Sequence, residues 1–443
     1  MAALPAKPDL GQLRKRAKDL ARAESVKLSE AQFRIAREHG FPSWPKLQAY
    51  VRRSAEGVQH AYHADTEYYG ERALGLLASA DDGTPSARAA FDRHRQPLTR
   101  EGARTVVARE HGFTSWRGLR EHVKTLAGSG EPFARAYGLV EARDVDGLAA
   151  IVDEFPELVH AVGTNGNDLL GMAGATCDER LSRVLLERGA DPARGNAHGW
   201  TPLHQAAYSN LPLLADLLLD AGAPLDVSSR GDGGTPLVVA LFWGNRTVAE
   251  RLARQGKAPR NLRVAAGLGD AELLDELVRP NGTLAPAAGA HREFYRPHSG
   301  FPFWRPSGDL AEIRDEALSW AARNDRTEAL RTLAARGADL DADVYRGTAL
   351  TWAAAQGKVA AVRTLLELGA EVNRVGTFGG PKHGVGITAL HLAAQGDHLD
   401  VLEVLIAAGA DLDARDGQWR STPEGWAEAC DSPAARELLA RAR

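Results

Sequence analysis

The chain has 443 residues, of which 25% are charged and 44% apolar, and its formal net charge is −4. This near balance is typical of a folded protein and argues against nucleic acid as a partner. No stretch approaches the ~18 apolar residues that a membrane helix needs, and residues 1–11 lack the apolar core of a secretory signal, so we expect no membrane partner.

Two cysteines, Cys177 and Cys430, lie far apart in sequence that is predicted to be helical. This arrangement predicts neither a disulfide framework nor a thiolate metal site. We therefore expect a protein of a reducing compartment, the cytoplasm, that carries no metal and no cofactor.

Residues 1–125 contain a duplicated motif. The segment IAREHGFPSW at 35–44 returns as VAREHGFTSW at 107–116. The pattern predicts a helix that stops at glycine, a buried phenylalanine, and a serine that caps a following helix. His39 and His111 fall in the last turn of the first helix, where a positive charge is favoured, so we expect them to cap it. These features indicate a helical N-terminal domain.

A second repeat organises residues 126–443. A threonine, usually followed by Pro-Leu or Ala-Leu, opens a short helix that often carries an Ala-Ala pair, and a second helix then ends in Gly-Ala. Thr201 and Thr235 stand 34 residues apart, as do Thr388 and Thr422. Threonine suits the N-cap, proline the first turn, and glycine the left-handed residue that ends a helix. The period predicts stacked helix pairs.

These motifs resemble the ankyrin-repeat family, whose period is about 33 residues. The resemblance implies an all-α solenoid of helix pairs with short β-hairpin or loop projections, with about nine units in residues 126–443. It also implies that His204 and His391, at the fourth position of the opening motif, bond to neighbouring hairpins. The HGFxSW repeat of residues 1–125 is similar to motifs that accompany ankyrin arrays in bacterial proteins.

Two insertions interrupt the array, at about residues 280–309 and 374–387. Both fall where a hairpin should project, so we expect both on the same edge of the concave groove. Their side chains suggest either acid–base chemistry or a grip on a carboxylate or phosphate. The candidates are His291, Glu293, Tyr295, His298 and His383 for chemistry, and Arg292, Arg296 and Lys382 for a small anion. Alternatively, the proline and aromatic residues of the first insertion fold down to fill the place of a missing hairpin.

Positions just past the Ala-Ala pair point into the groove of an ankyrin fold. Aromatic residues and arginine are common anchors of protein interfaces, so side chains at these positions are contact candidates. They are Tyr208, Phe242, Trp243, Arg323 and Gln356. For Phe242 and Trp243, burial beneath the first insertion is the alternative.

Two hypotheses about function follow from the sequence. We favour a scaffold that binds a protein or peptide through the concave groove. The alternative is an enzyme or a small-anion-binding protein whose site is built from the two insertions.

Overall fold

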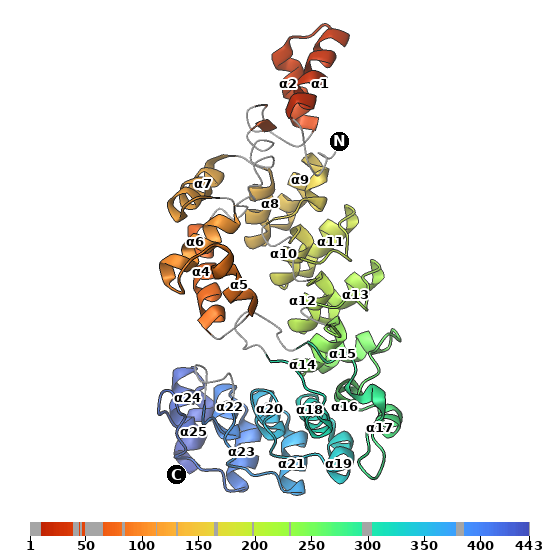
Figure 1. The fold of residues 1–443 in the computed structure, drawn as a ribbon, viewed down its shortest axis with the longest axis vertical. Coiled ribbons are helices and arrows are strands. Elements are labelled where there is room, and N and C mark those ends of the chain that lie inside the picture. The colour runs from red at the N-terminus through yellow and green to blue at the C-terminus, as the bar shows by residue number, and fades with distance from the viewer. Residues whose placement is uncertain are drawn as a thin grey trace. The chain divides into compact units, whose positions relative to one another are not determined.

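The computed structural model describes residues 10–38, 44, 47–48, 65–81, 85–111, 113–129, 132–163, 167–196, 199–229, 232–294, 304–377 and 385–442. All regular secondary structure in these ranges is helical, apart from three isolated β-bridges (Figure 1). The expected all-α repeat solenoid is therefore confirmed. Several predicted positions lie outside the described residues, namely His39, Tyr295, Arg296, His298, Lys382 and His383.

The described residues form two compact units. The first holds the chain up to Pro224 without residues 207–212, and the second holds residues 207–212 and the chain from Leu225 onward. Among the helices that are described, none is both long enough and apolar enough to cross a membrane. The boundary expected near residue 125 stays a prediction.

The first unit begins with two small helical clusters. In one, α1 and α2 pack together around Leu13 and Ile35, with Trp44 in the same core. In the other, four helices share a core that includes Phe91, Val107 and Leu119. These helices are α1 (Leu10–Ala23), α2 (Leu28–Glu38), α4 (Thr66–Asp81), α5 (Pro85–Arg93), α6 (Arg100–Glu110) and α7 (Trp116–Ser129).

His111 ends α6 as a neutral cap and not as a cation. Its Nδ1 atom donates a hydrogen bond of 2.8 Å to the carbonyl oxygen of Val107. Burial lowers the pKa of the imidazole to about 4, against the smaller raising effect of that bond. The expected positive charge at this helix end is therefore wrong, because the ring is buried with its centroid 5.2 Å from that of Tyr69.

The rest of the first unit continues as helix pairs that begin with aspartate caps. Asp144, Asp168 and Asp178 each accept a hydrogen bond from a backbone N–H in the first turn of the helix that follows. The helices are α8 (Pro132–Glu141), α9 (Val145–Glu154), η1 (Pro156–His160), α10 (Leu169–Ala175) and α11 (Glu179–Glu187), followed along the chain by α12 (Pro202–Tyr208) and α13 (Pro212–Asp220).

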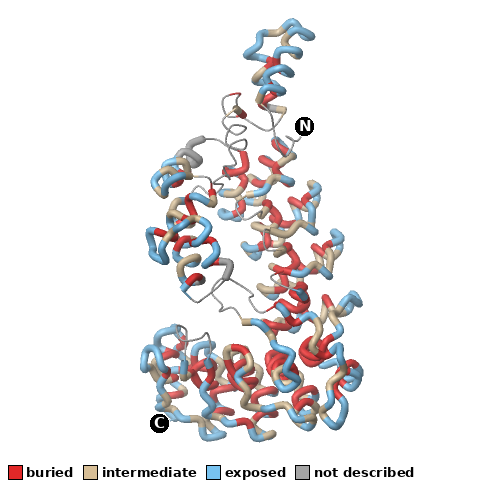
Figure 2. Tube along the Cα trace, viewed as in Figure 1, coloured by how far each residue is buried: buried red, intermediate tan, exposed pale blue. Residues whose placement is uncertain are grey.

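In the last four helix pairs of the second unit, the first helices form one row and the second helices another (Figure 1). Buried positions run along the first helices, whereas the turns between pairs are exposed (Figure 2). The pairs of this unit are α14 (Pro236–Phe242) with α15 (Arg246–Ala253), α16 (Leu262–Leu268) with α17 (Ala271–Leu277), α18 (Leu310–Arg323) with α19 (Thr327–Ala335), α20 (Ala349–Ala355) with α21 (Val359–Leu368), α22 (Ala389–Gln395) with α23 (Leu399–Ala407), and α24 (Pro423–Ala429) with α25 (Pro433–Ala442). A short helix, η3 (Pro286–Gly289), follows α17.

Threonine caps the first helix of several pairs, as the sequence predicts. The hydroxyl groups of Thr348 and Thr422 each accept a backbone N–H from three residues further on, at 3.2 Å. Thr388 forms a reciprocal cap with His391, whose Nε2 lies 3.2 Å from the carbonyl oxygen of Ser421 in the next hairpin. His391 thus joins two successive repeats, in agreement with the role that the resemblance implies.

Candidate functional site

The first insertion starts by filling the place where the α16 repeat lacks a hairpin. Asn261, which caps α16, donates its side-chain amide to the carbonyl oxygen of Ala290 at 2.9 Å. His291 Nδ1 lies 2.6 Å from a carboxylate oxygen of Asp232, in the preceding hairpin. Gly233 has a φ of 80°, and a Cβ there would lie 2.0 Å from the carbonyl oxygen of His291. This close approach shows that the insertion packs directly on that hairpin.

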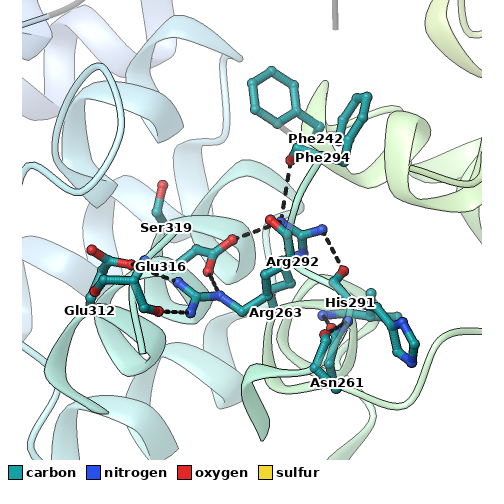
Figure 3. Close-up of polar contacts among 12 residues, drawn as sticks. Phe242, Asn261, Arg263, His291, Arg292, Phe294, Glu312, Glu316 and Ser319 are labelled. Atoms are coloured by element: carbon teal, nitrogen blue, oxygen red, sulfur yellow. Dashed lines mark hydrogen bonds and ion pairs between the residues drawn. The ribbon is translucent and has the colours of Figure 1, made fainter. Parts of the chain in front are cut away.

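A buried arginine holds the insertion in this place. Arg263, on α16, donates to the carbonyl oxygens of His291 and Arg292 at 3.1 and 3.3 Å. It also donates to the carboxylate of Glu316, on α18, at 3.0 Å. Burial lowers the pKa of the Arg263 guanidinium, and Glu316 acts in the opposite direction. The insertion is thus tied to both α16 and α18 (Figure 3).

The guanidinium of Arg292 also forms its hydrogen bonds and ion pairs within the protein. The group donates to Glu316 through Nε, to Glu312 at 3.1 Å and to the carbonyl oxygen of Ser307 at 2.9 Å (Figure 3). Its side chain is 4% exposed. The expectation that Arg292 grips an external anion is therefore corrected, because two carboxylates of the same chain already occupy its donors.

Phe242 and Arg323 are buried, although the sequence predicts that they face the open groove. Phe242 is 0% and Arg323 1% exposed. The Arg323 guanidinium carbon lies 3.6 Å from the ring centroid of Trp352 and 4.5 Å from that of Phe242. Burial lowers the pKa of Arg323 to about 9, so the guanidinium remains charged at neutral pH within a cage of rings.

This burial arises because α18 reaches past α16 to α14. Asn324, at the end of α18, donates its side-chain amide to the carbonyl oxygen of Leu241 on α14 at 2.8 Å. Gly267 on α16 leaves room for this contact, since a Cβ there would lie 3.3 Å from Leu241. Phe294 of the insertion then packs its ring 6.1 Å from that of Phe242. Phe242 is therefore buried beneath the first insertion, which was the alternative prediction for this residue.

The other described candidates are more accessible. Tyr208 and Trp243 are half-buried, with their ring centroids 5.4 Å apart, and Gln356 is half-buried. His291 and Glu293 are exposed. In the described part of the chain, no group of three or more His, Cys, Asp or Glu residues is placed to hold a metal.

A hollow of about 480 Å³ lies instead at the last repeats of the second unit. We call it the terminal hollow. Its wall combines the ends of α22 and α24 with residues of two hairpins, and most of its surface is apolar. The lining residues are Arg346, Gln395, Trp419, Ser421, Trp426, Ala429 and Cys430.

Asp416 accepts hydrogen bonds from both tryptophans of the terminal hollow. One oxygen of its buried carboxylate accepts the backbone N–H of Trp419 at 2.7 Å, and the other accepts the indole N–H of Trp426 at 3.0 Å. Burial alone would raise the pKa of Asp416, but these bonds and others from Gln418 and Ser421 hold it below its ordinary value. The rings lie 5.8 Å apart, and Trp419 is 61% exposed. The hollow therefore presents a pre-positioned aromatic wall.

Arg346 supplies the charge of the terminal hollow. Burial lowers the pKa of its guanidinium to about 10, so the group is protonated at neutral pH. The backbone there is left-handed, with a φ of 62°, as it is at Gly386 and Arg420 in the next two hairpins. The helix positions of the repeat and the two insertions do not point to this site. The available signal was the pair Trp419 and Trp426 within one hairpin and helix.

Comparison with protein families identifies the repeats. A model of three ankyrin repeats matches residues 170–261 and 262–375, and a single ankyrin repeat matches residues 385–417. These ranges include α14 to α23, and so most of the second unit.

Similar curated proteins share short segments with this chain. It is 31% identical over 94 residues to "Transient receptor potential cation channel subfamily A member 1" of Homo sapiens. The matched segment covers 20% of this chain and 8% of that protein. It is 42% identical over 50 residues to "Protein fem-1 homolog A" of Rattus norvegicus, covering 11% and 8%. It is 36% identical over 85 residues to "Ankyrin repeat and SAM domain-containing protein 6" of Mus musculus, covering 19% and 9%. The match spans less than a tenth of each of these relatives.

Proposed function

Because this chain belongs to the ankyrin-repeat proteins, with repeats matched over more than half of its residues, we propose that it is a scaffold that binds a protein or peptide. Ankyrin repeats stack into a curved surface, and such surfaces serve recognition. The exposed thiols of Cys177 and Cys430 support a reducing compartment such as the cytoplasm as its location.

The terminal hollow is the observation that carries this proposal. Tryptophan and arginine side chains are enriched among the anchors of protein interfaces, and this hollow contains both. Trp419 donates its backbone N–H to the Asp416 carboxylate and exposes 61% of its surface. The half-buried Tyr208, Trp243 and Gln356 remain further contact candidates in the second unit.

A small-anion or catalytic site in the first insertion has less support. Arg292 gives its donors to Glu312, Glu316 and a carbonyl oxygen, and His291 pairs with Asp232. A charged group that is already compensated within the protein gains little from a further anion. The described residues of this insertion therefore favour a structural role.

A matched pair of surface variants tests the scaffold function. Trp419→Ala removes the exposed ring of the terminal hollow, whereas Leu310→Ala removes an apolar side chain of similar exposure, 57%, at the start of α18. Tagged wild type and both variants are used to isolate binding proteins from a cell extract, and these are quantified by mass spectrometry. We expect one or a few proteins to be captured by wild type and Leu310→Ala and lost from Trp419→Ala. Identical captured sets for all three chains would count against binding at the terminal hollow.

A further inference from the structure

We infer that the terminal hollow binds an extended peptide with a large apolar side chain and an Asp or Glu side chain within a few residues of it. This inference rests on the proposed scaffold function and adds the chemistry of the partner. It commits to an acidic side chain as the source of the carboxylate.

The apolar half of the hollow selects the apolar side chain. Trp419 and Trp426 stand edge to face with an interplanar angle of 66°, and Ala429 and Cys430 complete a mostly apolar wall. A third ring can add to such a pair in the same edge-to-face manner. Since Asp416 accepts the indole N–H of Trp426 and the backbone N–H of Trp419, the Trp426 ring is held in place before a side chain enters, which lowers the conformational entropy lost on binding.

The charge of the hollow selects the carboxylate. Among the seven lining residues, Arg346 is the charged one at neutral pH, since the others are neutral amide, hydroxyl, thiol and apolar side chains. Burial lowers the pKa of Arg346 to about 10, which means that the protein already bears a cost for keeping the guanidinium charged. An incoming carboxylate offsets that cost and matches the planar guanidinium geometry.

The size and position of the hollow set the spacing of the two side chains. A hollow of about 480 Å³ suits a few side chains of a peptide, not a folded domain. Arg346 comes from the hairpin before α20, and Trp419 from the hairpin before α24, two repeats further on. The hairpin between them has Gly386 at the position equivalent to Arg346, so no side chain stands there. Arg346 and Trp419 line the same hollow, and an extended peptide advances about 3.3 Å per residue, so its apolar and acidic side chains lie within a few residues of each other.

Peptide selection and titration test the inference on the full chain. Random 12-residue peptides displayed on phage are selected against the wild type, and the enriched peptides are synthesised as pairs that differ only by Glu→Gln or Asp→Asn. Affinities are measured by fluorescence anisotropy for wild type, Arg346→Gln, Trp419→Ala and Arg420→Gln. Arg420 is the matched control, because it has the equivalent left-handed backbone position in the last hairpin but is exposed and does not line the hollow.

We expect the acidic peptides to lose about tenfold in affinity for the wild type when their carboxylate becomes an amide. The same change should have less than about a twofold effect on Arg346→Gln, while Arg420→Gln should behave as wild type. Trp419→Ala should weaken every enriched peptide by about tenfold or more. Peptide binding should also slow alkylation of the Cys430 thiol in the hollow and leave that of the exposed Cys177 unchanged.

The results distinguish failure of the inference from failure of the scaffold function. If peptides are enriched but their affinity for wild type is insensitive to Glu→Gln, the assignment of the carboxylate is overturned, whatever the stability of the Arg346 variant. Loss of binding on amidation of the peptide C-terminus would overturn the acidic side chain in favour of a terminal carboxylate. If the wild type enriches no peptide at all, the proposed scaffold function itself fails.

Discussion

Glu316→Gln gives the sharpest test of how the interrupted array is held together. The substitution keeps the size of the side chain but removes the charge that Arg263 and Arg292 share. It also places an amide N–H₂ group where two donors converge. All three side chains are almost fully buried, at 0%, 4% and 2% exposed for Arg263, Arg292 and Glu316. Water therefore cannot replace the missing carboxylate.

The expected cost follows from that burial. Two unit charges about 4 Å apart interact by about 4 kcal/mol at an effective dielectric constant near 20. Removing one partner of a buried ion pair costs about 3–5 kcal/mol, because the other charge stays desolvated. Arg292 keeps Glu312, at 3.1 Å, whereas the contacts that remain to Arg263 include the carbonyl oxygen of His291 at 3.1 Å and the ring of Trp320, whose centroid lies 4.7 Å from the guanidinium carbon. We expect a loss of about 3–5 kcal/mol, a large part of the 5–15 kcal/mol that typically stabilises a protein.

Glu250→Gln is the matched control. Glu250 also receives two arginines, Arg246 at 2.7 Å and Arg326 at 3.0 Å, but its side chain is 35% exposed. Solvent screens such a pair, so its loss should cost less than about 1 kcal/mol. Repeat arrays can unfold in parts, so hydrogen exchange of the α16 and α18 amides measures the local free energy of opening more directly than a global melt. Equal changes for the two variants would refute the argument that the buried carboxylate holds the insertion in place.

Three further predictions concern single residues. The free energy of unfolding should fall by about 3 kcal/mol as pH drops from 6.5 to 4, because the unfolded chain binds a proton that the His111 imidazole, with a folded pKa of about 4, refuses; in urea titrations His111→Gln should lack this part of the pH dependence. Gly233→Ala should cost more than the about 1–2 kcal/mol of Gly256→Ala, since both backbones are left-handed but a Cβ at Gly256 meets nothing within 4 Å; equal urea midpoints would contradict the packing of the insertion on this hairpin. Asp416→Ala should cost about 2–4 kcal/mol by leaving four donors without their acceptor, and speed proteolysis of the last hairpin, whereas Asp413→Ala, on the exposed part of the same loop, should not.

Local sequence signals predicted the helix pairs and their caps. Thr348 and Thr422 cap the helices that follow them because capping depends on a hydroxyl and the next three residues. His391 could be placed because its two bonds recur with the repeat. Information of this kind lies within about 34 residues of chain, so a single sequence contains it.

The burial of Phe242 and Arg323 could not be read from the same signals. Their positions in the repeat predict exposure, and they are covered because α18 contacts α14 across Gly267. Nothing in the α14 repeat itself indicates that contact. The positive charge predicted for His111 was wrong for a similar reason. The pKa of its imidazole depends on burial against Tyr69, which lies 42 positions earlier in the chain.

The first insertion also bears on where the proposed partner would bind. In an unbroken array, Phe242 and Arg323 would offer their side chains to a partner, but here Phe294 and Trp352 already cover them. The first insertion thus packs on positions that would otherwise face the groove. Beyond the second insertion, Thr388 and Thr422 are again 34 residues apart, and an exposed ring, Trp419, occurs there together with a charged hollow. The first insertion therefore covers two of the predicted contact residues, and the last repeats carry the exposed ring on which the proposed binding rests.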